Sequence, residues 1–300
     1  MAREAGVAAH RRPARGPLPA AALVCALAGI AGCAGPSGAA HGMTPQPSRT
    51  VAAPRAPSAP APPPAKPAKP TNPTPQPSRL PLTGDVIVLD PGHDGGNAAH
   101  PAIINQPVNV ITGQKACDTV GAVTAAGYPE HAFNFDVAIR LASLLHMDGA
   151  TVVLTRATDS GAGPCVTERA AIGNRAHANA AISIHADSGP PGGSGFEVIE
   201  PGLIPGYTSN IVGPSRRLGL DIRNEYRAIA GEPYSDYIGA AGLDVRTDLG
   251  GLNLSTVPKV FIECANMRNT IDADRLADPA FRQRVAIALA AGLSAFLRGR

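Results

Sequence analysis

Residues 1–83 have no uninterrupted apolar run as long as a membrane-spanning helix needs, which is about 18 residues or more. The apolar stretch of residues 18–31 is too short for that role. It follows four arginines and has the length of a signal-peptide core. We therefore expect the chain to be exported, with residues 1–33 as its signal peptide.

The end of this stretch, Ile30-Ala31-Gly32-Cys33, resembles a bacterial lipobox, in which the cysteine is lipidated and becomes the new N-terminus. A lipidated Cys33 would anchor the protein to a membrane. The alternative is plain secretion after a small-residue cleavage site. The expected location is the cell envelope or periplasm in the first case and the medium in the second.

The part of the chain expected to fold lacks an excess of basic side chains. Residues 1–83 carry nine of the 26 Lys and Arg side chains and one of the 23 Asp and Glu side chains, which leaves 17 basic and 22 acidic in residues 84–300. Nucleic acid binding depends on clustered basic side chains, so we expect no nucleic acid partner. No internal repeat is visible either.

Residues 43–82 have few large apolar side chains and consist mainly of Pro, Ala, Ser and Thr. Such a composition favours extended polyproline II and cannot bury a core. We expect residues 34–83 to form a disordered linker and residues 84–300 to form one folded domain. At about 3.1 Å per residue, 40 residues of this linker would reach at most about 120 Å.

The five cysteines differ in their surroundings. Cys117 and Cys165 lie in polar, Gly-rich contexts typical of loops, and export permits disulfides. They are predicted to form a bridge, and the alternative is two free thiols. Cys264 lies in an apolar run and is expected to be a buried small hydrophobe.

Short apolar runs and helical patterns alternate along the domain. The expected strands are residues 86–90, 151–155, 181–185, 196–200 and 259–263. The expected helices are residues 130–145, 166–178, 215–230 and 279–297. This alternation predicts the α/β class: a single domain with a mostly parallel central sheet flanked by helices on both faces. Residues 94–127 and 234–258 have the composition of long loops and are expected to border the cleft.

Three side chains with metal-binding or proton-transfer chemistry lie at or just past the ends of apolar runs. His93 follows VIVLDPG, His185 ends AISIH, and Glu263 ends KVFIE. Ligands bind at the carboxyl ends of strands in open α/β sheets, so these residues can converge in one cleft. Two imidazoles and a carboxylate suit Zn²⁺, and a carboxylate beside a metal can act as a general base. The combination indicates a zinc hydrolase.

Each of these residues also has a structural interpretation. His93 and His185 could each be a histidine satisfied by local hydrogen bonds. Glu130, at the start of a predicted helix, is a further ligand candidate, although a carboxylate at that place is favoured by the helix dipole alone. The neighbouring His131 is a competing ligand, but the two side chains point about 100° apart on a helix.

Glu263 is harder to explain structurally, because a carboxylate within an apolar run is costly to bury unless it is paired or faces a wet cleft. Asp90 or Asp187 could orient a ligand imidazole by accepting its hydrogen bond, or could merely cap a turn. The remaining histidines lack a strand-end context and are expected at the surface: His100, His146 and His177.

Four motifs in this order resemble the zinc-dependent N-acetylmuramoyl-L-alanine amidases of bacterial peptidoglycan. They are DPGH, the Glu of YPEH, SIHAD and ECANM. The resemblance extends from about Val86 to Leu297 and is strongest to the compact single-domain mycobacterial form, which has cysteines at corresponding places. It implies that zinc is bound by His93, Glu130 and His185, that Glu263 is the catalytic acid/base, and that the fold is α/β. No wall-binding repeat is appended.

The resemblance implies hydrolysis of the amide between N-acetylmuramic acid and L-alanine, with peptidoglycan or muropeptides as substrate. We also expect a monomer. Two alternatives remain open at this point: a zinc peptidase that cuts within the stem peptide, and a non-catalytic wall-binding lipoprotein on the same scaffold.

Overall fold

The computed structural model describes residues 79–300. The predicted signal peptide, Cys25, Cys33 and nearly all of the predicted linker lie outside the described residues. At its start, the described chain already belongs to the domain, because Leu82 is fully buried and its backbone N–H donates to the carbonyl of Asp148.

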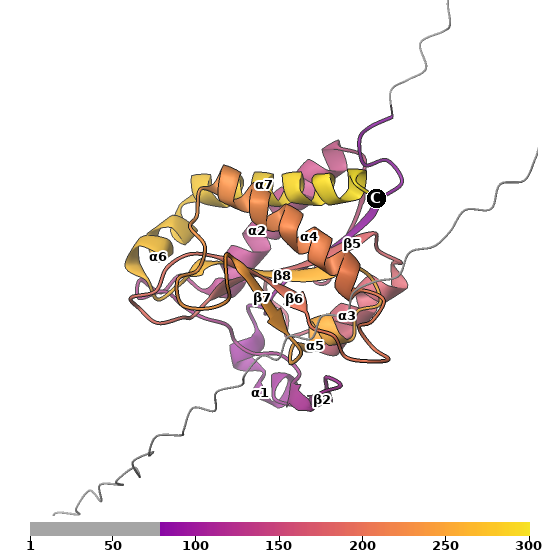
Figure 1. The fold of residues 1–300 in the computed structure, drawn as a ribbon. Coiled ribbons are helices and arrows are strands. Elements are labelled where there is room, and N and C mark those ends of the chain that lie inside the picture. The colour runs from indigo at the N-terminus through magenta and orange to yellow at the C-terminus, as the bar shows by residue number, and fades with distance from the viewer. Residues whose placement is uncertain (1–78) are drawn as a thin grey trace, which may run out of the picture. The chain divides into compact units, whose positions relative to one another are not determined.

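A six-stranded sheet forms the centre of the domain (Figure 1). Its order is β4 (Thr151–Leu154), β1 (Val86–Pro91), β5 (Ala180–Asp187), β8 (Lys259–Asn266), β6 (Glu197–Pro201) and β7 (Leu243–Arg246). The first four strands run parallel, β6 is antiparallel to β8, and β7 is parallel to β6. The mostly parallel sheet predicted from the sequence is confirmed.

Helices cover both faces of this sheet, as predicted. The larger layer contains α2 (Glu130–Met147), α4 (Val212–Glu225), the π-helical turn η2 (Tyr226–Ala230) and α7 (Pro279–Arg298). It encloses the main core together with alternate strand residues such as Ile87, Leu89 and Ile182. The other layer contains α3 (Val166–Arg175) and α5 (Gly250–Asn253), with a smaller cluster around Val88 and Ala181.

Within residues 79–300, α7 alone is long and apolar enough to cross a membrane by length and composition. Its apolar residues belong to the core of the domain, because Val285, Leu289 and Leu293 are fully buried there. The helix packs against both α2 and α4. Asp278 caps its first turn by accepting a hydrogen bond from the Ala280 N–H, and Pro279 occupies the first helical position.

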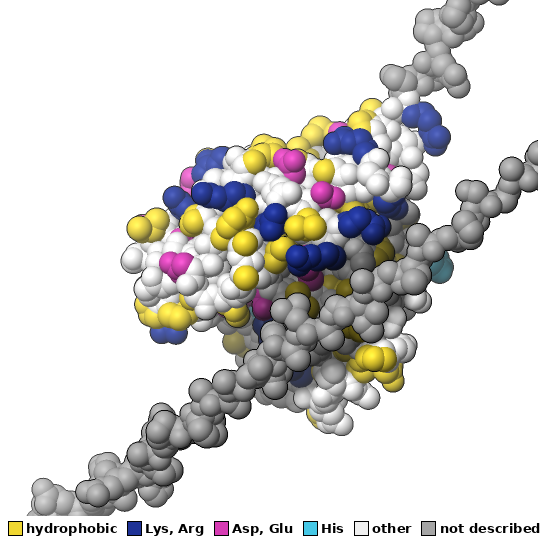
Figure 2. Space-filling model, in the orientation of Figure 1, with side chains coloured by type: hydrophobic (Ala, Val, Ile, Leu, Met, Phe, Trp, Pro, Cys, Tyr) yellow, Lys and Arg dark blue, Asp and Glu magenta, His cyan; other side chains and the backbone are white. Residues whose placement is uncertain are grey.

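The outer face formed by α4 and α7 is rich in basic side chains, as Figure 2 shows. Exposed arginines there include Arg216 and Arg217 of α4 and Arg284 and Arg298 of α7. Basic side chains therefore gather on this face, although residues 84–300 hold more acidic than basic side chains in total.

The prediction of two long loops was wrong in part. Residues 94–127 contain η1 (Asn97–Ala99), α1 (Pro101–Ile104) and a hairpin of β2 (Pro107–Asn109) and β3 (Gln114–Ala116). Residues 234–258 contain β7 and α5, and a further helix, α6 (Thr270–Ala277), was not predicted. The hairpin strands are largely exposed, so they carry no alternation of apolar and polar residues that a sequence pattern could reveal.

The predicted disulfide is present between Cys117 and Cys165, and Cys264 is a buried free thiol, as expected. The bridge joins the segment that follows β3 to the residue that precedes α3. It therefore ties the hairpin region to the main body of the domain.

Candidate active site

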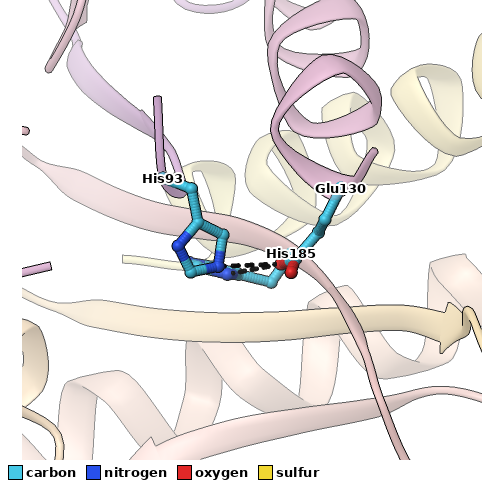
Figure 3. Close-up of side chains that lie close together, drawn as sticks. All are labelled: His93, Glu130 and His185. Carbon is cyan, nitrogen blue, oxygen red and sulfur yellow. Dashed lines mark hydrogen bonds and ion pairs between the residues drawn. The ribbon is translucent and has the colours of Figure 1, made fainter. Parts of the chain in front are cut away.

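His93, Glu130 and His185 come from three different elements and meet at the carboxyl edge of the sheet (Figure 3). His185 lies near the end of β5, and Glu130 is the first residue of α2. His93 follows β1 in a turn, where its φ of 58° is in the left-handed region. The sharp turn after Pro91-Gly92 is what directs this histidine into the cleft.

The three ligand atoms of this cluster lie within 4.8 Å of one another. Glu130 Oε1 is 3.2 Å from His93 Nε2 and 2.9 Å from His185 Nδ1. Figure 3 shows both imidazoles pointing toward the carboxylate. This donor set fits a divalent cation with three protein ligands and an open position, the arrangement of catalytic zinc sites.

The charges around the cluster already favour a positive charge at its centre. Burial alone would lower the pKa of His93, but the Glu130 and Asp118 carboxylates outweigh it and raise that pKa to about 10. Burial opposes ionisation of Glu130, yet the two histidines hold the pKa of its carboxyl well below the usual range. Burial lowers the pKa of His185, which favours the neutral imidazole that binds metals.

Two glycines make room for the rings. A Cβ on Gly92 would lie 1.9 Å from His185 Cε1. A Cβ on Gly121 would lie 2.7 Å from His93 Cδ2 and 2.9 Å from Glu130 Oε2, and its φ of 78° also favours glycine. The backbone therefore packs directly against the cluster on two sides.

Other contacts hold the ligands in place. The ring of His185 stacks on Phe261 of β8, with centroids 4.0 Å apart. The backbone N–H of Ala122 donates to Glu130 Oε2 at 2.7 Å, and the Asn134 amide donates to Glu130 Oε1 at 3.3 Å. Each donor orients the Glu130 carboxylate toward the histidines.

Glu263 lies beside the cluster, because its register partner on the neighbouring strand β5 is His185. Its Oε2 atom is buried and has no hydrogen-bond partner. Burial raises the pKa of the Glu263 carboxyl well above the usual range, and Glu130, Asp187 and Glu197 add to the effect. A carboxylate in this setting readily accepts a proton, which suits a general base.

The structure answers the open questions about the other candidates. His131 pairs with Asp159, with 2.8 Å between Nδ1 and Oδ2, and so faces away from the cluster. The expected surface histidines are all exposed: His100, His146 and His177.

Neither of the two aspartates considered for orienting an imidazole, Asp90 and Asp187, takes that place. Asp90 instead accepts hydrogen bonds from four buried donors, the side chains of Thr155, Arg169, Ser183 and Lys259. Asp187 accepts a hydrogen bond from the Ser188 N–H, which is the turn-capping alternative.

Sequence reasoning missed three residues around the site. Asp118 approaches His93, Arg169 is buried among charged and carbonyl groups, and Glu197 is the register partner of Glu263 on β6. Arg169 belongs to a helix and Asp118 to a loop, where charged residues are ordinarily solvated, so their types gave no signal. Glu197 is one of two carboxylates in the run FEVIE, the other being Glu200, and a carboxylate within an apolar run is the same signal that identified Glu263.

A cavity of about 470 Å³ opens at the cluster. His93, Glu130, His185 and Glu263 all line it, and so do residues of the hairpin and of the β7–α5 segment, including Lys115 and Asp248. The Lys115 ammonium pairs with the Asp248 carboxylate across 2.5 Å. The two segments predicted to border the cleft do border it. A cation ligand set with an adjacent unpaired carboxylate, inside a cavity of this size, can perform hydrolysis of a bound amide or ester.

Comparison with known proteins supports the same chemistry. A family model described as N-acetylmuramoyl-L-alanine amidase matches residues 87–295. A curated N-acetylmuramoyl-L-alanine amidase of Mycobacterium tuberculosis is 38% identical over 216 residues, which cover 72% of this chain and 88% of the relative.

Two solved amidase structures are similar to this chain as well. An N-acetylmuramyl-L-alanine amidase of Mycobacterium smegmatis is 39% identical with a TM-score of 0.69, and the match covers 73% of this chain and 99% of that one. One from Mycobacterium abscessus is 38% identical with a TM-score of 0.68, covering 72% of this chain and 100% of that one. The similarity thus takes in nearly the whole length of both solved chains.

Proposed function

Since the chain belongs to the N-acetylmuramoyl-L-alanine amidase family, we propose that it hydrolyses, with zinc, the amide between the lactyl group of N-acetylmuramic acid and L-alanine in peptidoglycan. The observation that carries the zinc requirement is the convergence of His93, Glu130 and His185 ligand atoms within 4.8 Å. We assign these three residues as the metal ligands.

A zinc ion held there would supply Lewis acidity to the scissile carbonyl and to the attacking water. The residues of the chain do the rest. Glu130 is fixed by the Ala122 N–H and by Asn134, so it stays oriented toward the metal position. Phe261 and Gly92 confine the His185 ring from either side.

Glu263 is the catalytic acid/base in this proposal. Its carboxylate takes a proton from the water that attacks the carbonyl carbon, and then delivers that proton to the amide nitrogen as the C–N bond breaks. The raised pKa of Glu263 supports this role, because its carboxylate gains a proton readily, and the protonated carboxyl can pass that proton to the more basic leaving amine.

The proposed substrate is peptidoglycan or a fragment of it, and the proposed location is the cell envelope. Export, lipidation of Cys33 and the disordered linker remain part of the proposal, since they concern residues outside the described part of the chain. We also propose a monomer.

The direct test is mass spectrometry of muropeptides incubated with the purified protein, with and without a chelator. The expected products are free stem peptides that begin with L-alanine and glycan that has lost them. Cleavage inside the stem peptide would instead identify a peptidase, and no zinc-dependent cleavage at all would leave a binding protein.

Variants separate the two kinds of site residue. His185→Ala is expected to lose both zinc and activity, whereas Glu263→Ala should keep zinc and fold and lose about 10²–10⁴-fold in turnover. Zinc analysis of each purified protein checks this. Stoichiometric zinc at this site in a His93→Ala, His185→Ala double variant would refute the ligand assignment, and loss of zinc from Glu263→Ala would refute its assignment as acid/base only.

A further inference from the structure

His93 differs from the other two proposed ligands in its backbone. Glu130 begins an 18-residue helix and His185 lies in a central strand, whereas His93 lies in a turn with a left-handed φ. The position of its ring therefore depends on side-chain and backbone contacts outside its own element. Its Nε2 atom faces Glu130, so those contacts are made at the opposite nitrogen, Nδ1.

The segment Asp118-Thr119 surrounds Nδ1 of His93. The Thr119 carbonyl oxygen is 3.0 Å away, its hydroxyl oxygen is 3.2 Å away, and Asp118 Oδ1 is 3.3 Å away. Within the described residues, Asp118 is the carboxylate that approaches this nitrogen. Asp90 and Asp187, which the sequence offered as possible orienting groups, have other partners.

Asp118 is itself held firmly. Its Oδ2 accepts a hydrogen bond from Arg169 Nη2 at 2.9 Å, and its Oδ1 accepts one from the Thr119 N–H at 2.7 Å. The side chain is only 5% exposed, and the preceding residue is Cys117 of the disulfide. A carboxylate so constrained has one available orientation toward His93.

Arg169 does not depend on Asp118 for its own place. Its guanidinium also donates to Asp90 and to the backbone carbonyls of Pro91, His93, Gly163 and Pro164. Removing the charge of Asp118 would therefore leave most of the Arg169 contacts intact. Arg169 therefore keeps its place without Asp118, so a change at Asp118 can be read at His93.

We propose that Asp118 is a positioning residue for His93, and that its carboxylate, fixed by Arg169, orients the imidazole so that Nε2 faces the metal. The inference rests on the proposed zinc function. A carboxylate near the distal nitrogen of a metal-bound histidine fixes the ring and makes the ligand nitrogen a stronger donor, and losing such a partner typically costs about 10–100-fold in metal affinity.

The test is the zinc affinity of Asp118→Asn, a variant that keeps the shape of the side chain and removes its charge. Zinc dissociation constants are measured by competition with a chromophoric chelator, and the Co²⁺-substituted protein gives an absorption spectrum that reports ligand geometry. We expect about 10–100-fold weaker zinc binding and an altered Co²⁺ spectrum. Asp136→Asn, which removes a carboxylate paired with Arg140 and Arg282 outside the cavity lining, should match the wild type in both.

Asp118→Glu is the second variant, and it restores the charge. It should bind zinc more tightly than Asp118→Asn. The proposal is overturned if Asp118→Asn binds zinc within twofold of the wild type, if it fails to fold, or if Asp118→Glu binds no better than Asp118→Asn. Failure of the proposed function would look different, because the wild type itself would then bind no zinc at this site.

Discussion

Gly92 shows how closely single residues are packed at the proposed metal site. Its φ is not in the left-handed region, so alanine fits the backbone there, but a Cβ would lie 1.9 Å from the His185 ring. The ring cannot retreat easily, because Phe261 stacks against it at 4.0 Å. The need for glycine at this position is therefore set by the neighbouring imidazole and not by the turn.

Gly92→Ala should displace His185 and lower activity by about 10²-fold or more, the cost typical of moving a catalytic group by about 1 Å. Steady-state kinetics on a muropeptide and zinc analysis check this. Gly192→Ala is the matched control, because a Cβ at that glycine meets nothing within 4 Å. Full activity in Gly92→Ala would show that the site can relax around a methyl group.

The buried carboxyl of Glu197 should make the free energy of unfolding depend on pH. Burial raises the pKa of its carboxyl to about 8, with Asp187 and Asp244 adding to the effect. Between the ordinary carboxyl pKa of about 4.5 and pH 8, the unfolded chain is ionised at this position while the folded one keeps the proton. The folded state then binds more protons, so this group makes stability fall as pH rises through that window.

Glu197→Gln should remove this contribution and flatten the decline in the free energy of unfolding between about pH 4.5 and 8. Urea unfolding at several pH values measures the slope in variant and wild type. Glu168→Gln, a change at a half-exposed residue paired with Arg175, is the control. A Glu197→Gln slope identical to that of the wild type would contradict the prediction.

At the scale of elements, the apolar runs gave reliable predictions because parallel strands buried on both faces must be continuous in apolar side chains. All five predicted strands exist, with ends shifted by three residues or fewer, and β5 and β8 continue past the predicted His185 and Glu263. The strand ends predicted the place of His93, His185 and Glu263. Short elements without a periodic apolar pattern escaped prediction, such as the exposed hairpin β2–β3 and the single turn α5.

Contacts between distant segments could not be predicted for the same reason. Asp118 meets Arg169 across 51 positions, and no periodic pattern encodes such a pair. Phe261 and His185 could be placed on neighbouring strands only once the strand order was known. The sequence predicted which residues reach the cleft but not which groups support them.

The disulfide, which ties the hairpin region to α3, should stabilise the folded domain. Cys117 and Cys165 are 48 positions apart, and the loop-entropy model gives an upper value of about 4 kcal/mol for closing a loop of that length. A Cys117→Ser, Cys165→Ser variant should unfold at lower urea concentration, with a loss in the free energy of unfolding of up to that amount. According to the loop-entropy model, the bridge stabilises mainly by restricting the unfolded chain.

Thiol labelling gives an independent check on the same bridge. In the unreduced protein, Cys117 and Cys165 should stay unlabelled even in denaturant, and buried Cys264 should react only after denaturation. Labelling of Cys117 without a reductant would contradict the prediction.

At the scale of the whole molecule, the resemblance of Ile30-Ala31-Gly32-Cys33 to a lipobox gives a prediction about location. If Cys33 is lipidated, Cys33→Ala should move the protein from the membrane fraction to the soluble fraction or medium, whereas Cys25→Ala should not. Fractionation followed by immunoblotting measures this. Stable anchoring takes more than one acyl chain, which a bacterial lipoprotein provides. Wild-type protein that is already soluble, with a mature N-terminus after Cys33, would contradict the lipobox interpretation.

Both ends of the described chain lie at the edge of the sheet opposite the cleft. Leu82 is anchored just before β1, and Arg300 pairs with Asp85 at the same place, as Figure 1 also shows for the C-terminus. The cleft opens at the other end of β1, about 20 Å away at 3.3 Å per residue. An affinity tag, a fluorescent label or a surface linkage on either end would therefore leave the cleft accessible, so the enzyme could be immobilised on a bead or sensor and still receive large fragments of cell wall.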